Sequence, residues 1–161
     1  MNNAILNNLQ NPVYKLYFHF LSYVLSLINT LNIELQSESC KVDVLLTNLA
    51  SLFKTILRNF IKREYLNSVD IQYVNVSNPH NFLAIENMYC GAKVDLLISS
   101  TTIDNCELVK FRTNVLSFYI ELSKQIQKRF NFKDEVLTFC SNFAPKVALS
   151  GEINSIVHSL F

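Results

Sequence analysis

Scarcity of glycine is the feature that most constrains this chain, which has two glycines and three prolines in 161 residues. Phosphate-binding loops, nucleophile elbows and many-stranded barrels each need several glycines, where the backbone takes a positive φ or touches a ligand. Half of the residues are hydrophobic, and there is no tryptophan. We therefore expect a mostly helical protein, and the catalytic loops that depend on glycine are excluded at the outset.

The length and the net charge of the chain limit the number of domains and the class of partner that it can have. The chain is long enough for one domain with its own core, over residues 1–161. Its 14 Lys and Arg residues balance 13 Asp and Glu residues, so the net charge of +1 does not predict a polyanionic partner. Charged residues make up 17% of the chain, below the roughly 25% of ordinary domains. Such a chain either buries much of its surface or presents apolar surface to a partner.

Hydrophobic periodicity predicts an all-α fold, an irregular bundle of about five to seven helices. The asparagine and proline at positions 11 and 12 are a typical helix start, and this first helix should end near Asn32. After a short polar link, a second helix is expected over about 40–63. Because both helices are long and the link is short, they should pack as an antiparallel hairpin.

The second half of the chain is expected to hold its strongest helix, from Asp104 to about Asn131. Asp104 and Glu107 form a pair that resembles a capping box. The strand-like segment 71–76 cannot form a sheet alone, so we expect an extended connection with at most one short strand. Shorter helices are expected from residue 79, over about 86–98, where a central glycine indicates a close helix crossing, and over about 133–142.

Residues 16–33 carry no formal charge and are about long enough to cross a bilayer. Their polar residues nevertheless gather on one helical face, which is typical of a bundle helix and not of a membrane helix. These polar residues are His19, Ser22, Ser26 and Asn29, opposite Tyr17, Phe20, Leu21, Val24, Ile28 and Leu31. The start of the chain has no basic segment followed by an apolar one, so no secretory signal is predicted. We expect an intracellular protein, nuclear or cytoplasmic, that does not bind membranes.

The chain offers no evident active site. Its four cysteines are scattered without metal-ligand spacing, so we interpret them as reduced and buried, with a disulfide pair as the alternative. A nucleophilic pair such as Cys90 with His80 is formally possible, but nothing local supplies an oxyanion hole or a third, orienting group. The aspartates fit solvated helix positions and helix caps. We therefore expect no enzyme activity, no metal, no cofactor and no small-molecule substrate.

Basic residues form two ridges at helical spacing. Such ridges bind phosphate backbones by neutralising charge, although they are also ordinary solvated helix faces. The first ridge is Lys54, Arg58 and Lys62 with Arg63 beside it, and the second is Lys124, Lys128 and Arg129. Weak, sequence-independent binding of nucleic acid through these residues is the alternative function that we carry forward.

Three segments together resemble the helical part of hAT-superfamily transposases. They are residues 11–21 (NPVYKLYFHFL), residues 31–38 (LNIELQSE), and residues 104–132, which end in SKQIQKRFNF. The order and spacing of these segments extend the resemblance over about residues 11–150. The motifs are mainly hydrophobic patterns with a few polar markers.

This resemblance implies a helical insertion region taken alone, from a domesticated or truncated copy of such a transposase. Members of the superfamily also have a zinc-binding finger and a strand-rich core that carries three catalytic acids, and this chain matches neither. No catalytic residue is therefore carried over. The resemblance implies a non-catalytic scaffold that binds a protein partner or a second copy of itself.

Overall fold

The structure is a computed structural model that describes residues 11–36, 42–136 and 139. This part of the chain is all-α, as predicted, with five α-helices and three short 3-10 helices. The α-helices are α2 (Pro12–Gln36), α3 (Val42–Arg58), α4 (Arg63–Ser68), α5 (Ala92–Ser100) and α6 (Asn105–Arg129). The 3-10 helices are η1 (Ile71–Tyr73), η2 (Pro79–Asn81) and η3 (Ile85–Asn87).

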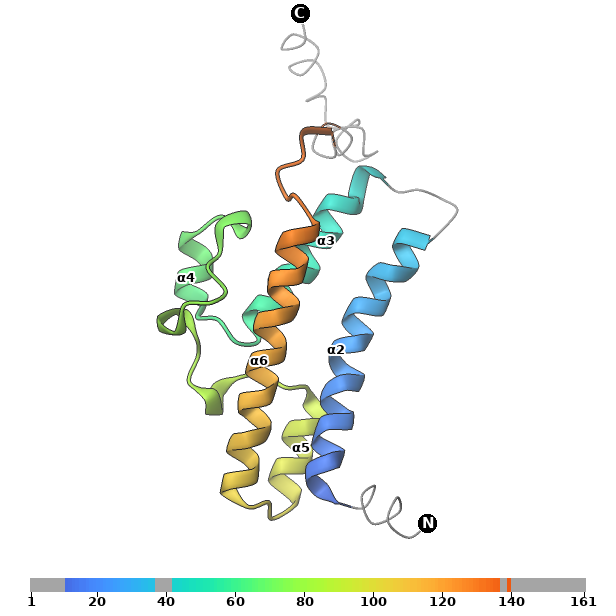
Figure 1. Ribbon diagram of the computed structural model, residues 1–161. Coiled ribbons are helices and arrows are strands. Elements are labelled where there is room, and N and C mark those ends of the chain that lie inside the picture. The colour runs from blue at the N-terminus through green and yellow to red at the C-terminus, as the bar shows by residue number, and fades with distance from the viewer. Residues whose placement is uncertain (1–10, 37–41, 137–138, 140–161) are drawn as a thin grey trace, which may run out of the picture.

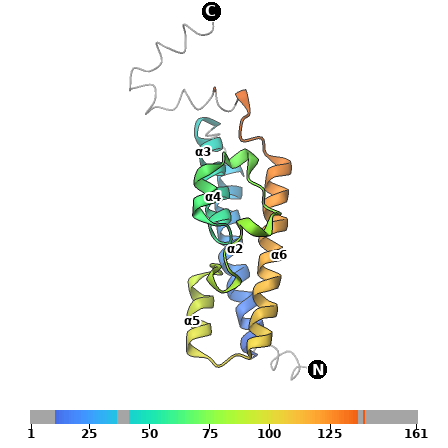
Figure 2. The same cartoon turned by 90° about the vertical axis from the view of Figure 1, so that its left-hand side faces the viewer.

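Two long helices, α2 and α6, run side by side in the same direction (Figure 1). Two shorter helices run the opposite way, α3 along one half of the pair and α5 along the other half (Figures 1 and 2). Helices α2 and α3 therefore form the antiparallel hairpin that the sequence predicts. Between α3 and α5 the chain leaves the main bundle, and the short helix α4 packs beside the end of α3 (Figure 1).

Two of the expected helix caps are present. The Asn11 Oδ1 atom accepts a hydrogen bond from the Val13 amide at 2.8 Å, at the start of α2. The Asp104 carboxylate accepts from the amides of Cys106 and Glu107, at the start of α6. These bonds satisfy amide groups that have no partner inside their helix. The Glu107 carboxylate pairs with Lys110 at 3.0 Å and does not complete a capping box.

The prediction that the second helix reaches residue 63 is wrong, because α3 ends at Arg58. Beyond that point the backbone pairs with a segment more than 20 residues later in the chain. The Asn59 and Phe60 carbonyls accept hydrogen bonds from the amides of Tyr89 and Leu83, at 2.9 and 2.8 Å. These non-local bonds replace helical ones, so the chain can leave α3 without burying unpaired carbonyls.

The helix expected over about 86–98 is present as α5, but its expected start near residue 86 is wrong. Residues 85–87 form η3, the next residues are extended, and α5 begins only at Ala92. Gly91 has a φ of +107°, which is accessible to glycine and rarely to other residues. A Cβ atom at this position would lie 2.9 Å from the Cβ of Tyr23. The glycine thus allows a close approach, as expected, but at a helix start and not inside a helix.

Three further segments differ from expectation, are shorter than expected, or lie partly outside the described residues. Residues 71–76 form no strand, and their first three residues form η1, which the Asp70 side chain caps. The short helix from residue 79 is the single turn of η2, with Asn78 as its cap. Half of the expected helix over 133–142 lies outside the described residues.

An aromatic core holds α2 and α6 against the segment that follows α3. Tyr119 of α6 is fully buried, and its ring stacks on Phe60 and meets Phe20 of α2 edge-on. The apolar spacing in the sequence of α6 predicts a core position for Phe118, but its side chain is only half-buried, at the border of the core. The rotation of α6 about its axis thus buries Tyr119 in place of Phe118, together with Phe111, Val115 and Ile126.

Candidate functional site

The outer face of α2 carries the most unusual surface feature of the molecule. Four large apolar side chains lie exposed on it in a row, and we call them the α2 stripe. They are Tyr14, Phe18, Leu21 and Leu25, which are 46%, 56%, 37% and 53% exposed. Their spacing of four, three and four residues places them on one side of the helix. The expectation that Leu21 faces the core is therefore wrong.

The core face of α2 is a separate set of residues. Leu16, Phe20 and Val24 are buried in the bundle. The Tyr17 hydroxyl accepts a hydrogen bond from Asn114 of α6 at 2.7 Å, which fixes the rotation of α2 about its axis. Apolar side chains thus cover the core face and also a second face that turns to solvent. A helix that is apolar around most of its circumference normally has neighbours on most sides.

The first predicted basic ridge is divided by the end of α3. Lys54 and Arg58 lie on α3 and Arg63 on α4, whereas Lys62 lies between these helices. The Lys62 amine donates a hydrogen bond to the His80 carbonyl at 2.7 Å, so part of its donor capacity is used within the fold. The expected continuous row of three basic residues on one helix is therefore wrong.

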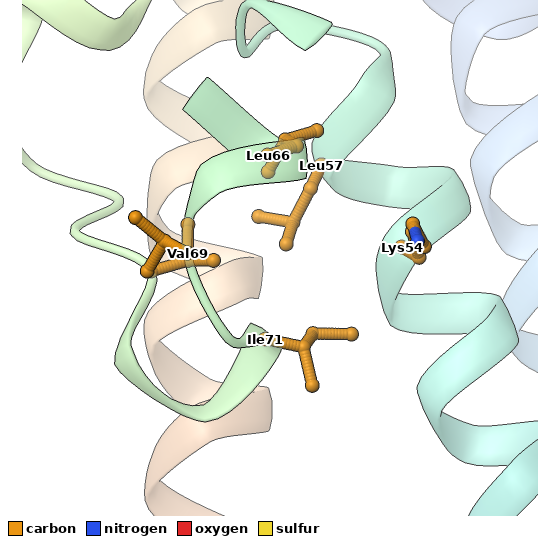
Figure 3. Close-up of a pocket in the computed structure, with 6 residues that line it drawn as sticks. Lys54, Leu57, Leu66, Val69 and Ile71 are labelled. Carbon is orange, nitrogen blue, oxygen red and sulfur yellow. The ribbon is translucent and has the colours of Figure 1, made fainter. Parts of the chain in front are cut away.

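The end of α3 and helix α4 enclose two neighbouring cavities that share Leu66. The larger, of about 330 Å³, is lined by Arg58, Arg63, Leu66 and Asn67. The smaller, of about 50 Å³, lies among mostly apolar residues, with Lys54 on α3 beside it (Figure 3). Its lining residues are Lys54, Leu57, Leu66, Val69, Ile71 and Val74. Within the described ranges, neither Arg58 nor Arg63 nor Lys54 forms an ion pair.

The second predicted ridge keeps its spacing. Lys124, Lys128 and Arg129 lie exposed on the last two turns of α6. Nearby, the Lys133 amine pairs with Asp70 at 3.1 Å and lies 4.7 Å from the centre of the Tyr73 ring. The Gln72 amide and, after it, Lys133 hold the pKa of the Asp70 carboxyl below its usual value. These contacts join the end of α6 to the loop that follows α4.

A buried polar network lies between the end of α3 and the start of α5. The sequence did not reveal it. The Tyr23 hydroxyl donates to the Asn59 side chain, which in turn donates to the Tyr119 hydroxyl, both at 3.2 Å. The Tyr119 hydroxyl donates to the Tyr89 carbonyl at 2.9 Å. Burial raises the pKa of Tyr119 well above its usual value and is also the main cause of a raised pKa at Tyr23. The neutral hydroxyls therefore act as a structural link between α2, α3 and α6.

The cysteine and histidine that were considered as a nucleophilic pair have different surroundings. Cys90 is buried and its thiol contacts the Met88 carbonyl, whereas His80 is exposed in η2. Burial raises the pKa of the Cys90 thiol to about 11. At neutral pH this thiol is protonated and is a poor nucleophile.

Among the described residues, no three His, Cys, Asp or Glu side chains lie close enough together to hold a metal ion. In the same ranges, no helix combines the length and the apolar character needed to cross a membrane.

Comparison with known proteins identifies no relative. No protein-family model matches the chain, and neither a curated protein nor a solved structure is significantly similar to it.

Proposed function

We propose that this chain is a non-catalytic helical module that binds another protein chain through the α2 stripe. The observation that carries the proposal is the row of Tyr14, Phe18, Leu21 and Leu25 on the solvent face of α2. Contiguous apolar patches on the surface of soluble proteins are often functional, and large ones commonly mark protein–protein interaction sites. A stripe with this spacing fits a partner helix that lies along α2.

The non-catalytic part of the proposal is supported by the chemistry of the buried groups. The Cys90 thiol is protonated at neutral pH because burial raises its pKa to about 11. Asn59 and Tyr119 are fully engaged with each other and with neighbouring groups. These side chains are used to hold the bundle together, which fits a scaffold.

The resemblance to the helical insertion of hAT-superfamily transposases belongs to this proposal. In that case the chain is an intracellular module from a domesticated or truncated copy, and its apolar stripe is surface that a full-length protein would cover. The coding sequence on either side tests this origin. An upstream finger and Asp-bearing strands, with a downstream Glu-bearing helix, would support it.

Nucleic-acid backbone binding is the second candidate function. It is favoured by one observation, that Arg58 and Arg63 line the same cavity without an ion pair in the described ranges. Arginine side chains in this situation bind phosphate groups readily. Lys54, Lys124, Lys128 and Arg129 would extend such a surface.

One photo-crosslinking experiment tests both candidates in cells that make the chain. A diazirine amino acid replaces Phe18 on the α2 stripe, Leu96 on α5 as a matched control, or Asn67 beside Arg58 and Arg63. Leu96 is 67% exposed and lies off the stripe. We expect discrete protein adducts from position 18 and only background from position 96, because a docked partner would cover the stripe alone.

Two results would count against this proposal. Equal yields at positions 18 and 96 would show that no partner prefers the stripe. Nuclease-sensitive adducts at position 67, with none at position 18, would favour the nucleic-acid candidate instead.

A further inference from the structure

We propose that the partner of the α2 stripe is a second copy of this chain, with the two α2 helices antiparallel across a two-fold axis. This inference rests on the proposed function, because it names the occupant of the surface described there. It is argued from three properties of α2, which are the spacing of its exposed residues, the absence of charge along the stripe, and the placement of charge at its ends.

The spacing of the stripe is self-complementary. The steps of four, three and four residues from Tyr14 to Leu25 continue at Ile28, which is half-buried, and at the exposed Asn32. Such alternating steps form the seam along which two helices interlock side chains. The series is symmetric about a point between Leu21 and Leu25, close to the middle of α2. An antiparallel pair centred there overlaps along the whole helix and places Leu21 against Leu25 of the second copy.

The neutral stretch of α2 permits this contact. In a two-fold interface each surface meets itself, so any charge within it would face a like charge nearby. No Asp, Glu, Lys or Arg occurs in residues 16–33. Exposed polar residues beside the stripe are the small and uncharged Ser22, Ser26 and Asn29, which allow two helices to approach without burying a charge.

The two ends of α2 select the antiparallel arrangement. Lys15 lies in the first turn, where the positive end of the helix dipole does not favour a positive charge. In an antiparallel pair, each Lys15 lies near the negative C-terminal end of the other α2. In a parallel pair, the two Lys15 residues would face the same positive end and each other.

The exposed surface of the stripe suggests a weak dimer. One pair of helices covers less than the roughly 800 Å² per partner of a standard interface. We therefore expect a dissociation constant in the region of about 1 μM to 100 μM, within the range of transient complexes.

Sedimentation velocity of the full chain over a roughly thousand-fold concentration range, spanning that expected region, tests the inference. We expect the wild-type chain to shift from monomer to dimer. The double variant Phe18→Gln/Leu25→Gln should stay monomeric throughout, whereas the control Leu96→Gln should dimerise like the wild type. A wild-type chain that is monomeric at the highest concentration, or a dimer that the double variant leaves intact, would overturn the inference.

The orientation is tested with a diazirine amino acid in place of Tyr14. The probe-bearing chain is mixed with isotopically heavy chain, and adducts between the two are mapped by mass spectrometry. Antiparallel pairing places the adducts in residues 28–36 of the heavy chain, and adducts near position 14 would contradict it. If the chain is monomeric but position 18 still captures a different protein in cells, the inference fails and the proposed function stands.

Discussion

Replacing Tyr119 with alanine is expected to cost about 3–5 kcal/mol of unfolding free energy, the usual range for deleting a large buried aromatic side chain. The Tyr119 ring is fully buried, stacks on Phe60 and meets Phe20 edge-on. Its removal would also leave the Asn59 amide and the Tyr89 carbonyl without their hydrogen-bond partner. Because the total unfolding free energy of a domain of this size is about 5–15 kcal/mol, the variant should be close to unfolded at 37 °C.

Urea unfolding followed by far-ultraviolet circular dichroism measures this effect, with Tyr119→Phe as the matched control. Phenylalanine keeps the ring and removes only the hydroxyl, so it should cost about 1–3 kcal/mol. If Tyr119→Ala costs no more than Tyr119→Phe, the ring contributes nothing and the described core is wrong. Such a result would also undermine the described rotation of α6.

Replacing Gly91 with alanine is expected to have the second largest effect. It should lower the unfolding free energy by about 2–4 kcal/mol, because backbone strain and overpacking act together. The φ of +107° is unfavourable for any residue with a Cβ. That Cβ would also lie 2.9 Å from the Cβ of Tyr23, where neither helix can yield easily. The same urea unfolding measurement applies.

A double-mutant cycle separates the two causes. In a Tyr23→Gly background the Cβ and the ring atoms of residue 23 are both absent and the steric conflict is removed, so Gly91→Ala should cost only the backbone part, about 1–2 kcal/mol. An equal cost in both backgrounds would show that the approach of Tyr23 to Gly91 is irrelevant. An Ala92→Gly control, one residue along at the start of α5, should cost no more than about 1 kcal/mol.

The parts of the fold that could be predicted from the sequence are those set by local interactions. Asn11 and Asp104 begin α2 and α6 as expected, because a cap needs only side-chain and backbone atoms within three residues. The end of α3 could not be predicted, since Phe60 and Ile61 continue its apolar pattern. That end depends on hydrogen bonds to residues 81–89, which no local pattern reveals.

The candidate site was missed for a related reason. The spacing of Tyr14, Phe18, Leu21 and Leu25 is visible in the sequence, but α2 has two apolar faces, and only the positions of α3 and α6 decide which one is core. The basic residues illustrate the same limit. Lys62 follows Arg58 at helical spacing, yet a turn separates them and the His80 carbonyl engages the Lys62 amine.

The central claim, that the α2 stripe is an interface and not part of the core, is tested most directly by the unfolding free energy of Phe18→Gln/Leu25→Gln. The measurement is made in dilute solution, where the chain is monomeric. Glutamine has nearly the helix propensity of leucine, so a truly exposed stripe predicts a change within about 1 kcal/mol of wild type. A loss of about 3 kcal/mol or more, similar to that of Tyr119→Ala, would show that the stripe is core and would contradict the account.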